Sequence, residues 1–184
     1  MNFPITYTDN FFNHPNKILD IAKNMEFFRP DKNESWKGLR SKPIHTTHPD
    51  LFHYIIDKVF SIYYDFNLEL VDWKNTHISF HKMNKEEIDS SDIHTDQDSL
   101  IAGVVYLNKD GDINNGTTIY DNYDNEILKF SNTYNSLICY DSKYRHCVTS
   151  CDKEIINLVF FVDTLQVKQT PLDRFRRVNL NYDF

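Results

Sequence analysis

Two histidines and one aspartate are spaced so that they could hold a metal ion. His94 and Asp96 lie two apart just before the apolar run 100–107, and side chains two apart in an extended segment point to the same face. His146 adds a second imidazole where the apolar run 136–141 is followed by another. Two imidazoles and one carboxylate occupy one face of an octahedral metal and leave the opposite positions open. Iron(II) needs this arrangement to bind a cosubstrate and dioxygen together.

Other possible ligands in the sequence have simpler explanations. His77 and His81 share one face of a predicted strand, where they could form a second imidazole cluster or a solvent-facing polar surface. Cys147, next to His146, lacks the second close pair of ligands that a zinc site needs, so we expect a cysteine that packs. Asp141 could accept a hydrogen bond from a metal-bound imidazole, or it could serve in a turn.

The spacing of apolar residues predicts the elements that must position these ligands. Helical spacing predicts one helix over 16–28, after Asn13-His14-Pro15, and a stronger one over 51–63, after Thr47-His48-Pro49. From residue 68 on, short runs typical of strands are separated by turns rich in Asn, Asp and Gly. These runs are 68–73, 76–83, 101–107, 117–120, 126–130, 136–141, 146–149 and 155–163. They predict an α+β, mainly β protein in which two N-terminal helices pack on a sheet, and a jelly roll is a common way to arrange eight such strands.

The length and composition are those of one globular domain. A chain of 184 residues with 40% hydrophobic and 15% aromatic residues is too apolar to be disordered and long enough to bury a core. We predict a single domain over 1–184, with a helical support region over 1–66, a jelly-roll core over 67–165 and a tail over 166–184.

Charge and cysteine content narrow the function classes. The net charge of -7 argues against a general binder of nucleic acid, which would concentrate Lys and Arg. Three cysteines form no paired framework, which indicates a reducing compartment. Because no signal peptide and no run of about 20 apolar residues is present, we predict a cytoplasmic protein without membrane contact. The sequence does not indicate an oligomeric state.

Several segments, in this order, resemble the 2-oxoglutarate/iron(II)-dependent oxygenases, specifically the prolyl-4-hydroxylase-like branch and its small phage and bacterial relatives. The resemblance covers roughly residues 76–163. The segments are His94-Thr95-Asp96, the strand that ends in Tyr106-Leu107-Asn108, Asn115-Gly116-Thr117-Thr118-Ile119-Tyr120, Leu137-Ile138-Cys139-Tyr140-Asp141-Ser142 leading through Arg145 to His146-Cys147-Val148, and Asn157-Leu158-Val159-Phe160-Phe161-Val162. Trp36-Lys37-Gly38-Leu39-Arg40-Ser41 also looks like an N-terminal motif of the phage-type relatives.

The resemblance implies a double-stranded β-helix, a cupin-like jelly roll whose mouth holds iron(II) on His94, Asp96 and His146. It also implies that Tyr106 hydrogen-bonds the far carboxylate of 2-oxoglutarate. The expected reaction is hydroxylation of an aliphatic C–H in a peptidyl or small-molecule substrate, with dioxygen consumed and 2-oxoglutarate converted to succinate and carbon dioxide. Two other functions stay open: a catalytically silent jelly-roll module that binds a ligand, and a zinc-dependent hydrolase that uses the same triad.

One departure from the family concerns the cosubstrate site. The family usually places Arg or Lys at the start of the last core strand to pair the far carboxylate, whereas the matching stretch here is Glu154-Ile155-Ile156-Asn157. Losing such a contact costs about 1.5–3 kcal/mol, so we expect another basic group to replace it, with Asn157 also facing the cosubstrate. The basic candidates are Arg40, Lys82, Lys129, Arg145 and Lys153. Arg40 ranks first because it lies in a motif-like segment outside the predicted strands, although it could instead bind the substrate.

Overall fold

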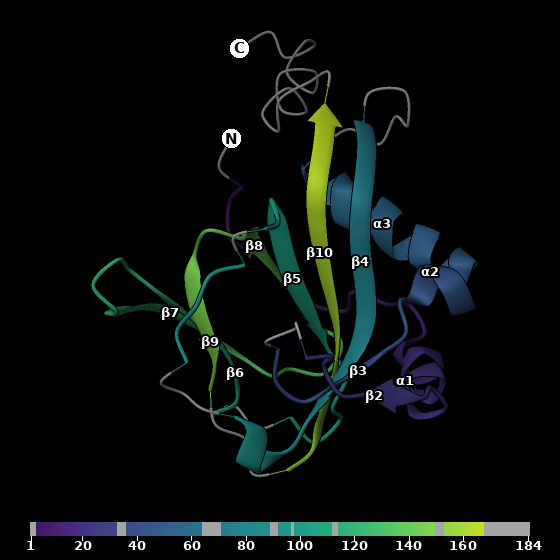
Figure 1. The fold of residues 1–184 in the computed structure, drawn as a ribbon, viewed down its shortest axis with the longest axis horizontal. Coiled ribbons are helices and arrows are strands. Elements are labelled where there is room, and N and C mark those ends of the chain that lie inside the picture. The colour runs from purple at the N-terminus through teal and green to yellow at the C-terminus, as the bar shows by residue number, and fades with distance from the viewer. Residues whose placement is uncertain are drawn as a thin grey trace, which may run out of the picture.

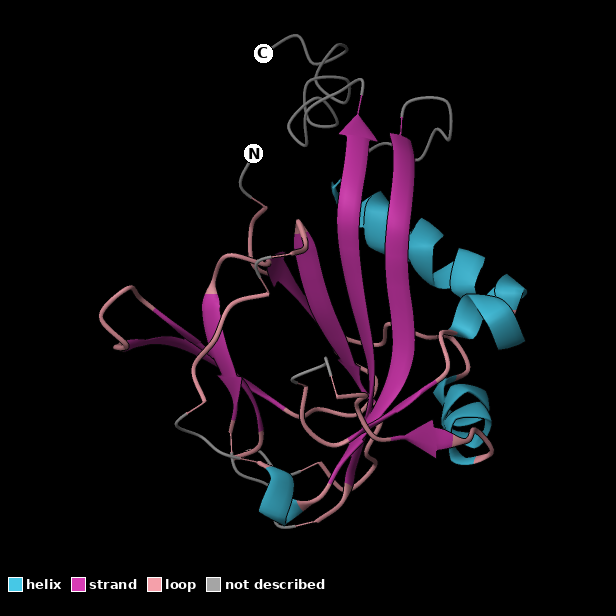
Figure 2. Ribbon diagram, in the orientation of Figure 1, coloured by secondary structure: helices cyan, strands magenta, loops and turns pink. Residues whose placement is uncertain are grey.

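The computed structural model describes residues 3–32, 36–63, 71–88, 92–96, 98–111, 114–149 and 153–167. Its strands form a seven-stranded sheet in the order β1-β8-β5-β10-β4-β3-β2 and a three-stranded sheet in the order β7-β6-β9, and every strand pair in the described part of the chain is antiparallel. The small sheet lies on one side of the large sheet and the main helices lie on the other (Figures 1 and 2). The elements are β1 (Thr6–Thr8), α1 (Pro15–Lys23), β2 (Phe27–Phe28), β3 (Leu39–Ser41), α2 (Ile44–Thr47), α3 (Pro49–Tyr63), β4 (Val71–Met83), the 3-10 turn η1 (Lys85–Glu87), β5 (Ile101–Tyr106), β6 (Gly116–Tyr120), β7 (Glu126–Ser131), β8 (Leu137–Asp141), β9 (Arg145–Val148) and β10 (Ile155–Val167).

Alternation along β5 separates two apolar layers. All six residues of β5 are buried, and Ile101 and Val105 join the large cluster that includes the helices. Ala102, Val104 and Tyr106 join the second cluster, which faces the small sheet. Because successive side chains of a strand point to opposite faces, this strand lies between the helical layer and the small sheet. The predicted α+β, mainly β class is confirmed.

The helices cover the outer face of the large sheet. The predicted apolar stripe of α3 is buried: Phe52, Ile55, Ile56, Val59, Phe60 and Tyr63. The first helix begins at Pro15, one residue before the predicted start, and the prediction that it runs to residue 28 is wrong. It ends at Lys23, and Phe27–Phe28 instead form β2, which pairs with β3 at the sheet edge. The backbone hydrogen bonds of that edge outweigh the helical spacing of the apolar side chains there. In the described part of the chain, no helix is long and apolar enough to cross a membrane.

The eight predicted strand runs correspond to seven strands. The runs 68–73 and 76–83 merge into β4 where they are described, and the break between them coincides with Asn75, whose φ of 52° is left-handed. The strand β10 continues to Val167, beyond the predicted end of the core. The N-terminal region also adds the short strands β1, β2 and β3 to the large sheet, besides its helices. Arg40 on β3 therefore belongs to the same sheet as β5, which follows His94 and Asp96, and β8, which precedes His146.

Candidate metal centre

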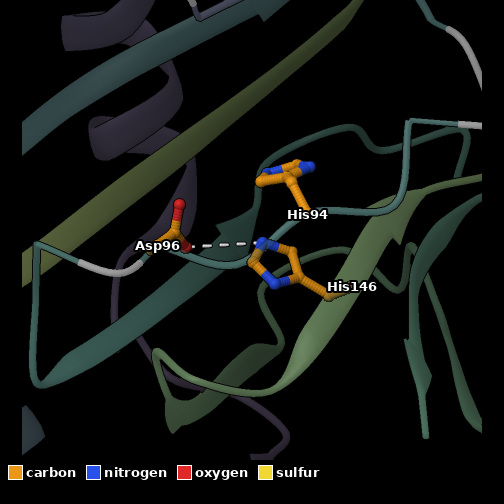
Figure 3. Close-up of side chains that lie close together, drawn as sticks. All are labelled: His94, Asp96 and His146. Carbon is orange, nitrogen blue, oxygen red and sulfur yellow. Dashed lines mark ion pairs between the residues drawn. The ribbon is translucent and has the colours of Figure 1, made fainter. Parts of the chain in front are cut away.

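Main-chain pairing brings the two predicted imidazole ligands together. His94 forms an isolated antiparallel bridge with His146, with reciprocal N–H to carbonyl distances of 3.0 and 2.8 Å. The amide of Asp96 donates to the carbonyl of Ser142 at 3.0 Å. The segment before β5 is thereby attached to the turn between β8 and β9 and to the start of β9, and the three side chains converge in Figure 3. The predicted triad is therefore assembled from two segments about 50 residues apart in sequence, one with His94 and Asp96 and the other with His146.

Hydrogen bonds orient both imidazole rings for metal binding. Nδ1 of His94 lies 2.9 Å from the carbonyl of Asp92, and Nδ1 of His146 lies 3.0 Å from the carbonyl of Tyr144. A carbonyl only accepts, so each Nδ1 carries the proton and each Nε2 keeps its lone pair. Imidazoles that bind metals commonly donate their other N–H in this way, which fixes the tautomer and the ring orientation.

The donor atoms fit one divalent ion. One atom from each of the three residues lies within 4.8 Å of the other two, and Nε2 of His146 is 3.4 Å from Oδ2 of Asp96. Ligand bonds of about 2.0–2.2 Å at right angles would separate two donor atoms by about 3 Å, so small side-chain rotations complete the site. Burial lowers the pKa of His146 below its usual value, which favours the neutral form that a metal requires. Hence the site accepts a metal without first losing a proton from this ring.

Asp141 does not orient His146. Its Oδ2 accepts from the amide of Phe3 at 3.1 Å and its Oδ1 accepts from the amide of Lys143 at 3.1 Å. The turn role, one of the two predicted alternatives, is confirmed, and the carbonyl of Tyr144 takes the place of the carboxylate. The sequence contained no signal for this carbonyl, because any residue type supplies one.

A cavity of about 600 Å³ opens beside the triad. Cross-strand register places four of its lining residues in one row across the large sheet: Arg40 pairs with His81, His81 with Asn157, and Asn157 with Tyr106. Residues directly opposite one another on neighbouring strands share a face of the sheet. All predicted cosubstrate residues therefore face the cavity that contains the metal ligands.

The end of the cavity around Tyr106 is polar and uncharged. Tyr106 is 2% exposed, its hydroxyl donates to Oγ1 of Thr117 at 2.7 Å, and burial raises its pKa far above the usual range. The buried Oδ1 atoms of Asn132 and Asn157 have no hydrogen-bond partner among the described residues. Buried polar atoms without partners cost free energy, so a bound polar group would complete this end of the cavity. Sequence reasoning missed Thr117 and Asn132, since both come from the small sheet and its flanking loop.

Of the five basic candidates, all of which the structure describes, Arg40 lines the cavity and the other four do not. Lys82 pairs with Glu154 at 3.1 Å and Arg145 pairs with Asp124 at 2.6 Å. Lys129 and Lys153 are exposed. The cavity also contains one lysine that the sequence did not suggest, Lys37, whose Nζ pairs with Asp92 at 2.9 Å.

The remaining histidine and cysteine alternatives are also resolved. His77 is exposed and pairs with Asp163 at 3.3 Å, whereas His81 lines the cavity with Nε2 2.6 Å from the carbonyl of Lys37. They make no second metal cluster among the described residues. Burial lowers the pKa of His81 to about 4. Cys147 is buried, with its Sγ 3.3 Å from the hydroxyl of Tyr120, as a packing thiol would be.

One aromatic neighbour of the triad was not predicted. The ring of Tyr140 lies 5.0 Å from that of His146, and burial raises the pKa of this tyrosine well above its usual value. Tyr140 lies on β8, in the segment 137–142 that resembles the family, but the apolar residues of this segment indicated only a buried strand. It forms a neutral wall of the cavity beside the metal ligands.

No family model and no curated protein matches the chain. Several solved structures do share its fold. A prolyl hydroxylase from Trichoplax adhaerens, solved with a peptide fragment of the hypoxia inducible factor oxygen degradation domain, has a TM-score of 0.65 at 12% identity over 97% of this chain and 87% of that chain. A 2OG-Fe(II) oxygenase family protein from Burkholderia pseudomallei has a TM-score of 0.57 at 16% identity over 86% of this chain and 84% of that chain. A Pseudomonas putida prolyl-4-hydroxylase has a TM-score of 0.51 at 12% identity over 86% and 91%. With these neighbours, the two facing antiparallel sheets identify the fold of this chain as a double-stranded β-helix, as its sequence predicts.

Proposed function

We propose that the chain is an iron(II)- and 2-oxoglutarate-dependent oxygenase of the prolyl-4-hydroxylase-like branch. The observation that carries this proposal is the convergence of two imidazole nitrogens and one carboxylate oxygen in the lining of one cavity. Iron(II) and 2-oxoglutarate, when bound, would supply oxidative chemistry in which one oxygen atom of dioxygen hydroxylates an aliphatic C–H of the substrate and the other enters the succinate formed, with carbon dioxide, from 2-oxoglutarate. The fold is consistent with this, since the solved structures that resemble it include prolyl hydroxylases and an oxygenase.

The chain's own residues would hold the iron and the far carboxylate of 2-oxoglutarate in the same cavity. His94, Asp96 and His146 would bind the iron. Tyr106 and Asn157, which pair in register on β5 and β10, would contact the far carboxylate of 2-oxoglutarate. Because the uncharged end provides a hydroxyl and amides in place of a strand cation, we expect weaker cosubstrate binding than an arginine would give. The buried aromatic wall at Tyr140 would exclude water next to the metal.

Peptidyl and small-molecule substrates both suit this fold. One structural neighbour was solved with a peptide fragment, which supports a peptide-like substrate. The cavity of about 600 Å³ is within the size range of small-molecule sites, which supports a small substrate as well.

A combined binding and turnover experiment tests the proposal. Anaerobic titration of the iron(II) protein with 2-oxoglutarate should produce the weak metal-to-ligand absorption band, and admission of dioxygen should produce succinate. The variant His94→Ala should lose both signals, whereas His14→Ala, at an exposed histidine before α1, should keep them.

Two outcomes would replace the proposal. A metal-loaded protein with neither the band nor succinate would indicate the silent binding module, which is favoured by the absence of a cation beside Tyr106 among the described residues. Hydrolysis with bound zinc, lost in His94→Ala, would indicate the hydrolase. Persistent succinate formation in His94→Ala would contradict the metal assignment itself.

A further inference from the structure

The N-terminal segment 36–41 lines one wall of the cavity and is attached through Lys37 to two other segments. The carbonyl of Lys37 accepts a hydrogen bond from His81 on β4, and its ammonium group pairs with Asp92 just before the ligand His94. Gly38 adopts a φ of 80°, and a Cβ there would lie 2.5 Å from the carbonyl of Lys82. Only glycine satisfies both the left-handed backbone and this close approach. The wall is therefore held to the central sheet and to the metal-binding segment.

The guanidinium of Arg40 is held between two aromatic rings on this wall. Its Cζ lies 4.7 Å from the centroid of Trp36 and 5.3 Å from that of Phe161. Arginine stacks on aromatic rings through the faces of its planar group and presents its N–H donors along the edge. Such packing reduces the rotamer freedom that an arginine would otherwise lose on binding an anion. Arg40 is thus preorganised inside the cavity.

The side chain of Arg40 extends toward the metal end of the cavity. Its backbone is in register with Asn157, but its guanidinium contacts Phe161, four residues along β10 and about 13 Å away at a rise of about 3.3 Å per residue. Phe161 pairs with Ala102, and Ala102 pairs with Tyr140, the tyrosine that contacts His146. Two strand spacings, about 10 Å, therefore separate Phe161 from the strand beside the metal ligands.

We infer that Arg40 binds the carboxylate of the primary substrate and that this substrate is a free α-amino acid. The inference rests on the proposed function and identifies the substrate class of that site. Arg40 and the triad line the same cavity, so a small acid with its carboxylate on Arg40 would have its side chain in the space that the triad faces. The polar end with Tyr106 lies away from the guanidinium and stays available for the cosubstrate.

The charges around the cavity favour a zwitterion over a dianion such as a phosphate. The lining includes Glu87, Asp92 and Asp98 besides the metal ligand Asp96. Glu87 pairs with Arg29 and Asp92 pairs with Lys37, whereas Asp98 makes no hydrogen bond or ion pair within the described ranges. Asp98 therefore attracts the ammonium group of an amino acid and repels a second negative charge. A planar carboxylate also matches the paired donors of a single guanidinium.

Fluorescence of Trp36 provides a binding readout that does not depend on turnover. The chain has two tryptophans, so the replacement Trp73→Phe leaves Trp36 as the reporter. The anaerobic protein with iron(II) and 2-oxoglutarate would be titrated with each of the twenty standard L-amino acids and with its carboxamide. We expect at least one amino acid to change the fluorescence and its carboxamide to bind at least about 10-fold more weakly, because the amide lacks the charge.

Variants of Arg40 then separate the substrate role from the cosubstrate role. Arg40→Met keeps an unbranched apolar side chain between the rings, and it should weaken amino acid binding about 10- to 100-fold while 2-oxoglutarate affinity stays unchanged. Arg40→Lys should retain part of the binding, since it keeps the charge but loses the paired donors. The control Lys129→Ala removes a positive charge from an exposed position outside the cavity and should change neither affinity.

Three results would overturn the inference. A parallel loss of 2-oxoglutarate affinity in Arg40→Met would make Arg40 the cosubstrate cation, as the sequence first suggested. Equal binding of acids and amides, or no binding by any acid, would exclude a carboxylate contact. Failure of the proposed function gives a different pattern: succinate is absent from the unmodified protein, while an amino acid that binds through Arg40 still supports the site.

Discussion

Metal binding should stabilise the fold, and the exposed position of His94 makes this effect separable from folding. A metal that binds only the folded chain at 100 times its dissociation constant stabilises by about 2.7 kcal/mol. For a chain of this length, each kcal/mol raises the melting temperature by about 2–4 °C. Saturating Mn(II), used in place of iron(II) to avoid oxidation, should therefore raise the melting temperature by about 5–11 °C.

The variant His94→Ala should lose this shift without losing the fold. Changes in the groups that only orient metal ligands cost about 10- to 100-fold in affinity, so loss of a ligand itself should cost at least 100-fold. At the same metal concentration, the stabilisation then falls to about 0.4 kcal/mol, or about 1 °C. Because the side chain of His94 is exposed, the free energy of unfolding of the metal-free variant should lie within about 0.5 kcal/mol of that of the unmodified protein.

Differential scanning fluorimetry with and without Mn(II) measures both quantities. His14→Ala provides the matched control, since it removes an exposed imidazole from the entrance of α1 and should keep the full shift. A shift above 5 °C in His94→Ala, or its loss in His14→Ala, would refute the assignment of the triad as the metal site.

Three further changes test other parts of the structure. Tyr106→Phe removes the hydroxyl from the polar end, so 2-oxoglutarate should bind about 10-fold more weakly in anaerobic titration while the Mn(II) shift persists; unchanged affinity would place the cosubstrate elsewhere. Burial lowers the pKa of His81 to about 4, so the unfolded chain takes up a proton first as the pH falls below about 6.5. The free energy of unfolding should therefore fall from pH 6.5 toward 4. Urea denaturation at pH 7.5 and 5 should show a smaller loss in His81→Gln than in the unmodified protein. Equal losses in both proteins would contradict the burial of this ring. Gly103→Ala places a Cβ 2.3 Å from the ring of Phe160 and 2.8 Å from the carbonyl of Ile138, so it should cost about 1–3 kcal/mol in urea denaturation. A neutral Gly103→Ala would mean that β5 is less tightly packed than described.

Local patterns in the sequence were sufficient for most elements and for the metal ligands. The buried stripe of α3 and the core strands follow from apolar periodicity, because each element buries one face and the apolar residues recur in the sequence with the period of that face. His94 and Asp96 were identifiable because residue types with metal-binding chemistry stood next to a strand. The failure at Phe27–Phe28 has the opposite origin, since the edge of β3 is a distant partner that no local pattern reveals.

The identity of each ligand's partner and the position of the cavity depend on pairing between distant segments. The row from Arg40 to Tyr106 crosses β3, β4, β10 and β5, so its register follows from how the whole sheet assembles. The same packing turns the guanidinium of Arg40 toward Phe161, a choice of side-chain direction that depends on which rings lie within reach. Residue types and spacing thus indicated the metal chemistry, whereas long-range pairing and side-chain packing set which groups face the substrate.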